Sequence, residues 1–332
     1  MTQSDDLDRR LEALGEPEAS SPAQPAEEEL RALERLIRRR VRNICLKTLL
    51  AVVICAAMVF GLINPLAKLT AFNPISMEED DGGFTQYLNA YFGTMQPYVR
   101  VTGTDITDTG FGTYDVALYA VGPKNLKVYV GGYTDVHLTI CQGEAEVTSD
   151  PTGKLTKYLG RFDSDLMDRA DLLAELEKLP SSAYIRLSVG TDTPRTPEEL
   201  RTLPAEVVWA QIYDPDMEYQ GGVNLSPSLL FGNEVDPREL DGQEMAQYYA
   251  DILELLLTQP KLLTSLGIFS NYRVYYTTGV VEEALGSARE MEAFRSQNFC
   301  VQGSRDEILA LIDQVEPTSL LVDHIFLTSL SE

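Results

Sequence analysis

The feature that most constrains this chain is an uncharged run close to its N-terminus. Twenty residues without a charged side chain separate Lys47 from Lys68, and as an α-helix they would extend about 30 Å, the thickness of a bilayer's hydrocarbon core. Nearly all of them are apolar, so this helix lacks the polar face that a soluble core helix presents to water. A secretion signal is the nearer alternative, but 43 residues precede the predicted helix and signal peptides have shorter apolar segments. We therefore predict an uncleaved transmembrane helix over residues 44–67 that ends or kinks at Asn64 and Pro65.

The charges on either side of the run predict its orientation. Residues 31–47 carry seven basic residues and one acidic residue, whereas the other flank carries Lys68 followed by four acidic residues at 78–81. Basic residues are enriched on the cytoplasmic side of membrane helices. We expect a single-pass protein of the cell membrane, with its N-terminus in the cytoplasm and about 260 residues outside. The arginines expected to set this topology are Arg38, Arg39, Arg40 and Arg42.

The predicted cytoplasmic tail, residues 1–43, contains two apolar stripes and no core. A proline-containing hinge at residues 15–25 separates two short helical patterns. The apolar residues that recur at helical spacing are Leu7, Leu11, Leu14, Leu30, Leu33 and Ile37. So short a tail cannot bury both stripes in a compact core. We interpret these six residues as the contact surface for a cytoplasmic partner; the alternative is that the second helix lies on the inner leaflet.

For the rest of the chain, the sequence predicts a connector and two folded parts. Residues 68–83 form an acidic connector, residues 84–179 a β-rich module and residues 180–332 an α/β domain. The β-rich module begins with a short helix around Tyr87 and ends with a helix at 164–178. Its strands, rich in Val, Ile, Tyr and Thr, are expected at 97–106, 113–121, 126–132 and 134–142.

The α/β domain contains two strand–helix–strand patterns. The first spans residues 183–213 and the second residues 298–327, with a buried helix predicted at 242–266 between them. Two such units favour an α/β sandwich, with the ferredoxin-like arrangement as one form. The predicted fold class is a single-pass membrane protein with a helical tail, one transmembrane helix and an extracytoplasmic α+β region.

The charge of the outer part limits its partners. Residues 69–332 hold 41 acidic and 17 basic residues. Direct binding of nucleic acid is disfavoured, because neutralising phosphates needs clustered Lys and Arg. An acidic surface that keeps an extracytoplasmic domain soluble is the simpler interpretation.

Two of the four cysteines fall in the predicted transmembrane helix and two in the predicted outer part. Cys45 and Cys55 fall in the apolar helix, and Cys141 and Cys300 in the outer part, where disulfides are permitted. A disulfide between Cys141 and Cys300 is compatible with this location. Two buried free thiols are the alternative, since two cysteines so far apart in the sequence do not amount to a disulfide framework.

Catalytic and cofactor motifs do not occur in the sequence. The two histidines, His137 and His324, each lie in a predicted strand, where a partly buried imidazole is expected rather than a base or metal ligand. Zinc-protease, serine-hydrolase and phosphate-loop patterns do not occur. A carboxylate pair among the many acids stays compatible with the sequence, but no pattern points to one. We expect a protein that is not an enzyme and that has no cofactor or metal.

Two parts of the sequence resemble a known family. The segment AYIRLSVGTDTPRTPEEL at 183–200, the following Val207–Trp209, FCVQGSRDEILAL at 299–311 and LLVDHIF at 320–326 are similar in order and pattern to the C-terminal domain of the sigma factor regulator family. The Arg-rich helix that runs into the apolar segment resembles that family's N-terminal domain. The likeness covers residues 30–70 and 180–328. The tail departs from the family's short basic tails in its acidic start, and it holds no His or Cys, which excludes the zinc-binding fold of many other anti-sigma factors.

This resemblance implies a signalling role. The family's members are bacterial, membrane-bound anti-sigma factors, so the tail would hold an extracytoplasmic-function sigma factor at the membrane. Release would follow when the outer domain senses an envelope signal or protein. Two alternatives fit the same layout: a non-enzymatic envelope assembly or scaffold protein, and an extracytoplasmic ligand receptor.

Overall fold

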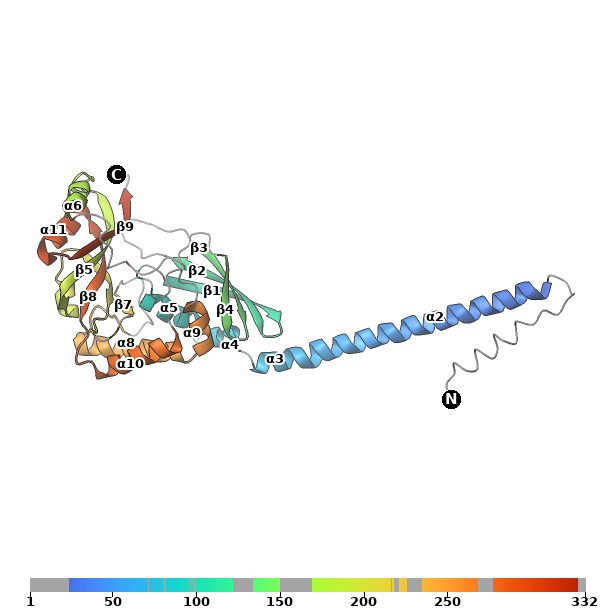
Figure 1. The fold of residues 1–332 in the computed structure, drawn as a ribbon. Helices are drawn as coiled ribbons and strands as arrows, with labels where there is room; N and C mark the ends of the chain where they lie inside the picture. Colours follow the sequence, from blue (N-terminus) through green and yellow to red (C-terminus); the bar gives the residue numbers. More distant parts are fainter. Residues whose placement is uncertain are drawn as a thin grey trace. The chain divides into compact units, whose positions relative to one another are not determined.

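The computed structural model describes most of the chain in two compact units. The described residues are 24–70, 72–80, 82–95, 97, 100–121, 134–149, 169–215, 217, 221–225, 235–267 and 277–327. The N-terminal unit comprises Met1–Ile63 and the C-terminal unit Asn64–Glu332. The ribbon in Figure 1 shows the elements of each unit.

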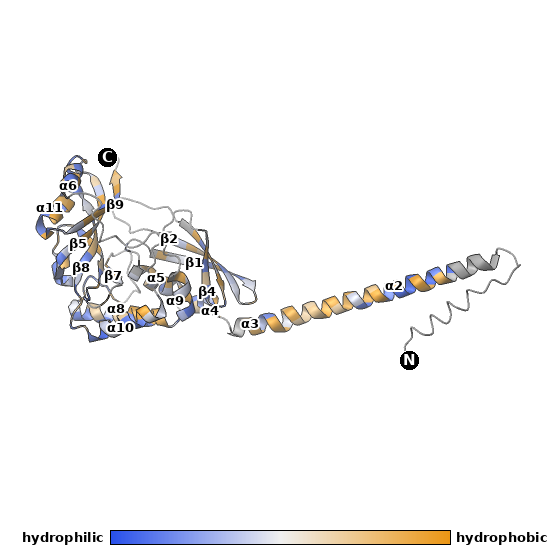
Figure 2. Cartoon of the chain, viewed as in Figure 1, coloured by the Kyte–Doolittle hydropathy of each residue, from blue (hydrophilic) through white to orange (hydrophobic). Residues whose placement is uncertain are grey.

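A long helix dominates the N-terminal unit. The α2 helix (Gln24–Met58) is followed directly by the π-helix η1 (Val59–Ile63). Figure 2 shows that the colour of α2 changes from hydrophilic toward its start to hydrophobic toward its end. One helical segment in the described part of the chain, Leu33–Ala67, is long and apolar enough to cross a membrane, and none of its most apolar window is buried by protein.

The sequence predicted that the helix ends or kinks at Asn64 and Pro65, and the structure shows that it does not end there. Helical structure continues from η1 into α3 (Asn64–Thr70), where Pro65 is the second residue. A proline inside an α-helix lacks the N–H that would bond to the carbonyl four residues earlier. A π-turn shifts the hydrogen bond to the fifth residue, so η1 lets the backbone pass the proline without ending.

The first sheet of the C-terminal unit is an antiparallel meander. It contains β1 (Arg100–Gly110), β2 (Thr113–Val121), β3 (Thr134–Cys141) and β4 (Glu144–Ser149), in that order. The side chains of β2 alternate between the core and solvent, with Tyr114, Val116 and Leu118 buried. Three predicted strands are confirmed, β4 was not predicted, and the strand predicted at 126–132 lies outside the described residues.

The second sheet interleaves the two predicted strand–helix–strand units. The first unit is β5 (Ala183–Arg195), α7 (Pro197–Arg201) and β6 (Glu206–Gln211); the second is β8 (Ser296–Ser304), α11 (Arg305–Val315) and β9 (Ser319–Leu327). With β7 (Gly222–Asn224) at one edge, the order is β7-β6-β8-β5-β9, and every pair of neighbours is antiparallel. The two strands of each unit are therefore parallel and separated by a strand of the other unit, the split arrangement of a ferredoxin-like sheet.

Helices cover the sheet and join it to the meander. The α6 helix (Arg169–Glu177) packs on α11, and α11 lies against β5 and β8. The segment between β7 and β8 supplies α8 (Gly242–Leu257), α9 (Pro260–Gly267) and α10 (Thr278–Glu290). The single helix predicted at 242–266 is thus two helices, because Pro260 lacks an N–H and starts a new one. The α10 helix was not predicted from the sequence.

One buried helix holds the two sheets together. The α5 helix (Gly83–Met95) follows the short α4 (Pro74–Glu79) and contacts both β1 and β7. Its Asn89 exchanges two hydrogen bonds of 2.8 Å with the backbone of Val101 on β1. On the other side, the indole Nε1 of Trp209 on β6 donates to the carbonyl of Gly93 at 2.9 Å. The β-rich module and the α/β domain therefore share one hydrophobic core.

Candidate functional site

The predicted partner-contact residues that the structure describes lie exposed on α2. Leu33 and Ile37 are each 54% exposed. Their neighbours Leu36 and Val41 are exposed as well, so this apolar stripe has no cover within the described chain. Leu30 lies in α2, but its side chain is outside the described residues, and so are Leu7, Leu11 and Leu14.

The arginines expected to set topology lie on the same stretch of α2. Arg38 forms an exposed ion pair with Glu34, one turn earlier, with 2.8 Å between Nη2 and Oε1. Arg39, Arg40 and Arg42 are exposed. The basic residues therefore surround the apolar stripe immediately before the uncharged run.

The disulfide that the sequence allowed does not form. Cys141 is an exposed free thiol on β3, and Cys300 is a buried free thiol on β8, in the other sheet. The Cys300 Sγ lies 3.4 Å from the hydroxyl of Ser188, which itself donates to a carboxylate oxygen of Asp323 at 2.7 Å. Packing within the fold, and not a disulfide bond, keeps the Cys300 side chain in place.

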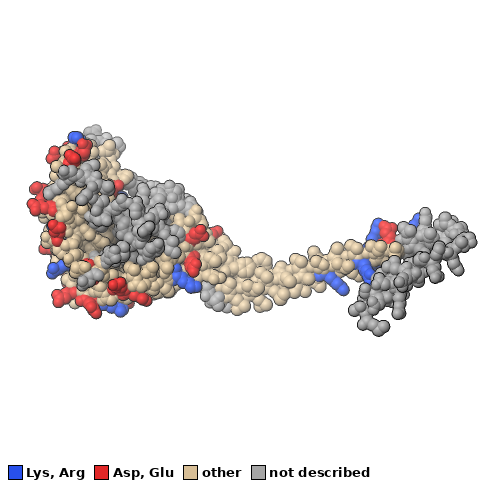
Figure 3. Space-filling model, in the orientation of Figure 1, with Lys and Arg blue, Asp and Glu red and all other residues tan. Residues whose placement is uncertain are grey.

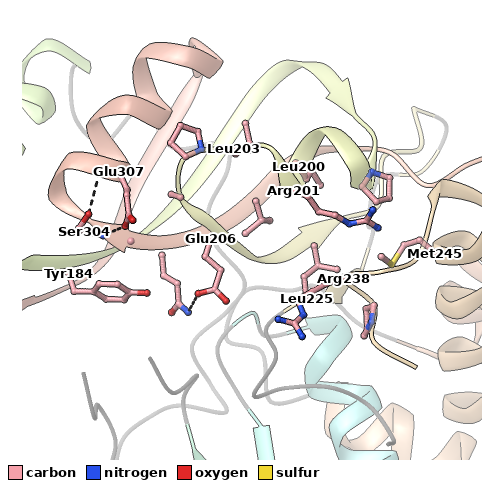
Figure 4. A pocket seen from close by; sticks show the side chains of 17 residues that line it. Tyr184, Leu200, Arg201, Leu203, Glu206, Leu225, Arg238, Met245, Ser304 and Glu307 are labelled. Atoms are coloured by element: carbon pink, nitrogen blue, oxygen red, sulfur yellow. Dashed lines mark hydrogen bonds between the residues drawn. The ribbon is translucent and has the colours of Figure 1, made fainter. Parts of the chain in front are cut away.

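A cavity of about 550 Å³ opens beside the split sheet, where α7, α8 and α11 meet β6 and β8. This volume lies within the roughly 300–1,000 Å³ range of small-molecule sites. Figure 4 shows Tyr184 and Glu206 on one side of the cavity and Arg201, Arg238 and Met245 on the other, with Leu200 and Leu203 between them. The cavity therefore combines an apolar middle with charged edges.

Buried apolar side chains form the floor of this cavity. They are Pro197, Leu200, Val207, Leu225 and Met245. The local sequence positions them through capping. Thr196 and Glu199 form a capping box at the start of α7, which turns Leu200 toward the sheet, and Ser304 and Glu307 form another at the start of α11.

The acceptors of the cavity come from two neighbouring strands. Gln302 on β8 is paired in register with Glu206 on β6, and its Nε2 donates to the Glu206 carboxylate at 2.8 Å. This hydrogen bond fixes the orientation of the amide. The Gln302 side chain is only 1% exposed, and its Oε1 has no hydrogen-bond partner among the residues that the structure describes.

The two guanidinium groups of the cavity already have partners. Arg238 donates to both carboxylate oxygens of Asp236. This hydrogen bonding lowers the pKa of Asp236 and raises that of Arg238. Arg201 donates to the backbone carbonyl of Leu240. Glu206 forms no ion pair among the described residues, but its negative charge also contributes to the raised pKa of Arg238. The cavity therefore carries charges of both signs.

Sequence reasoning missed the cavity residues Glu206, Gln302, Arg201 and Arg238. One signal was present, because Gln302 is a large polar residue inside the strand FCVQGS. Neither His137 nor His324 is buried; both imidazoles are exposed, and the His324 ring lies 4.1 Å from that of Phe326. Within the described ranges, no group of three His, Cys, Asp or Glu side chains is placed to hold a metal ion.

The chain was also compared with known proteins. No protein-family model, curated protein or solved structure matches it.

Proposed function

We propose that this protein is a single-pass membrane anti-sigma factor, with its N-terminus in the cytoplasm and its C-terminal unit outside. The proposal combines three supports. They are the apolar segment within Leu33–Ala67, the basic residues that precede it, and the resemblance of residues 30–70 and 180–328 to the sigma factor regulator family. The tail would sequester a sigma factor until the outer unit receives an envelope signal.

The observation that carries the proposal is the bare apolar stripe of α2. Leu33, Leu36, Ile37 and Val41 lie on the polar side of the uncharged run, and each is more than half exposed. Apolar side chains at consecutive helical turns are typical of a helix that docks in a groove of another protein. Their closeness to the membrane segment would hold the captured protein at the membrane.

Capture from native cytosol tests the proposal. The full-length protein, tagged and reconstituted in nanodiscs, is incubated with cytosol from its own source, and the bound proteins are identified by mass spectrometry. We expect an alternative sigma factor to be recovered. The double substitution L33D/I37D should reduce its recovery roughly tenfold or more, since it places charges in an apolar interface.

The matched control changes the polar face of the same helix. E34Q/R38Q removes the exposed ion pair one turn away and leaves the apolar stripe intact, so recovery should be unchanged. Equal amounts of each variant in the membrane fraction show that topology was kept. Recovery of envelope machinery alone, or equal recovery with L33D/I37D, contradicts the anti-sigma proposal and favours an assembly or scaffold role.

A further inference from the structure

The turn between β1 and β2 lies beside the end of the uncharged run. The backbone N–H of Phe111, at the tip of this turn, donates to Oδ1 of Asn64 at 2.6 Å, and Asn64 is the first residue of α3 (Figure 1). The uncharged run ends at Ala67, three residues later, which is about 5 Å along a helix. In a membrane-spanning chain, the turn therefore lies where the hydrocarbon core meets the headgroups.

This hydrogen bond explains a polar residue in an apolar segment. A backbone N–H without a partner is costly where water is scarce. Asn64 interrupts the apolar run, and its side chain supplies the acceptor for the N–H of Phe111. The turn can therefore approach a bilayer with this backbone group satisfied.

The side chain at the tip of the turn is unusual for its place. Phe111 has a φ of +55°, in the left-handed region that favours Gly and Asn, and its side chain is 40% exposed. The corresponding turn between β3 and β4 has the polar, exposed Gln142 at a φ of +53°. Phe111 is thus neither a residue that the turn favours nor part of the core, and such an outlier points to a function.

The second turn at this end of the meander also lies close to the chain that follows the uncharged run. A Cβ placed on Gly143 would lie 3.2 Å from the Cβ of Phe72. The Phe72 ring in turn packs against that of Phe84 on α5, with 6.1 Å between the centroids. Both turns are therefore on the side of the meander where the chain enters the C-terminal unit.

A contact of this end with lipid has to be apolar. Figure 3 shows acidic side chains spread over the visible face of the C-terminal unit. Asp108 and Glu144, beside the two turns, are exposed. Anionic headgroups repel such a surface, whereas an aromatic side chain gains from leaving water whatever the charge of the lipid.

We propose that Phe111 inserts into the outer leaflet of the membrane. The partner is the boundary between headgroups and acyl chains of a phospholipid bilayer, and residues 110–112 are the part of the turn that contacts it. The C-terminal unit then has a second membrane contact besides its covalent link to α2. This inference rests on the membrane-spanning α2 of the proposed function, but not on the capture of a sigma factor.

Quenching of tryptophan fluorescence by brominated lipid tests the contact. The full-length protein is reconstituted in nanodiscs of phosphatidylcholine with or without dibrominated acyl chains. The sole native tryptophan, Trp209, is completely buried and gives the unquenched baseline. We expect the added tryptophan of F111W to lose most of its emission in the brominated nanodiscs. T102W, exposed on β1 roughly 25 Å along the strand, should stay unquenched.

V53W, in the middle of the uncharged run, separates failure of this inference from failure of the membrane span. Quenching of V53W without quenching of F111W would leave α2 in the bilayer and overturn this inference alone. No quenching of either variant would overturn the inference together with the membrane-spanning α2. Equal quenching of T102W and F111W would reflect general adhesion to lipid and would overturn a contact made through this turn.

The substitution F111N tests whether Phe111 serves the fold instead. Asn adopts left-handed backbone more readily than Phe, so F111N should not lower the denaturant midpoint in detergent. A lower midpoint would assign Phe111 to the stability of the fold and overturn the inference. T109W places a tryptophan on the same turn, and adding F111N to it should abolish its quenching by brominated lipid. Quenching of T109W that persists with F111N would show that Phe111 does not make the contact.

Discussion

The α2 and α5 helices differ in what covers their apolar side chains. In α5, Phe84, Tyr87 and Leu88 are completely buried against the rest of the C-terminal unit. In α2, Leu50 is 58% exposed, and the rest of the uncharged run is similarly bare. Apolar content alone does not distinguish these helices, but their polar residues do. Asn89 and Thr94 of α5 each donate a hydrogen bond to a backbone carbonyl. In α2 the charged residues lie toward its start, and its apolar part contains no charged residue.

The same residue type therefore has two different roles in this chain. An apolar side chain on α5 stabilises the fold by leaving water, at roughly 25 cal/mol per Å² of buried area. A side chain on α2 gains nothing of this kind until a bilayer or another protein covers it. Substitutions at matched positions of the two helices should therefore have separable effects.

The largest effect is expected in the core of α5. Leu88→Ala should lower the free energy of unfolding by about 2–5 kcal/mol, because it leaves a cavity beneath a fully buried side chain. The matched change Leu50→Ala on α2 should leave the unfolding of the C-terminal unit unchanged. Denaturant titration of the full-length protein in detergent, followed by Trp209 fluorescence, measures both. Equal losses of stability in the two variants would contradict this difference between α5 and α2.

The next largest effect is expected on the insertion of α2 into the bilayer. Val53→Arg places a charge near the middle of the uncharged run, where insertion into a membrane becomes less favourable by about 2.5–3.5 kcal/mol. The fraction of protein that stays in membranes after alkaline extraction should fall, whereas Val53→Leu should leave it unchanged. A protein that remains fully membrane-bound with Val53→Arg would show that α2 is not covered by lipid at this position.

A smaller effect is expected at the helix ends of the folded unit. Ser304 caps α11 by accepting from the backbone N–H of Glu307 at 3.4 Å. Ser304→Ala should cost about 1 kcal/mol of unfolding free energy. The exposed Ser181→Ala, before β5, should cost far less. The same titration in denaturant ranks the two variants, and equal costs would contradict a capping role.

The smallest effect is expected on the polar face of α2. Glu34→Gln removes the exposed ion pair with Arg38, and such pairs contribute only a few tenths of a kcal/mol to a helix. The helical content of the full-length protein by circular dichroism should change little, and less at high salt. A large loss would mean that this pair, and not the apolar run, maintains the start of α2.

Much of the fold could be predicted because the signals are local. The uncharged run alone indicates α2, and the alternation of polar and apolar residues locates β2 and β5. Short elements were missed where the pattern is brief. The β4 strand has six residues, two of them glutamates, and β7 has three. Asn64 and Pro65 indicated a helix end or a kink, because no sequence pattern announces the π-turn that accommodates the proline.

The cavity could not be predicted for a different reason. Glu206 and Gln302 are 96 residues apart and meet only through the pairing of β6 with β8. That pairing depends on the interleaving of two strand–helix–strand units, which neither unit specifies by itself. The exposed stripe of α2 was predictable because its residues are neighbours in one helix.

The membrane topology is the central claim, and the native cysteines allow a direct test. A membrane-impermeant maleimide is added to intact spheroplasts that express the full-length protein. We expect Cys141, exposed on β3, to react, while Cys300 is shielded by the fold and Cys55 by lipid; Cys141→Ser should abolish the labelling. Labelling of Cys141 only after lysis, or labelling of Cys55 in intact spheroplasts, would contradict a membrane-spanning α2 with the C-terminal unit outside.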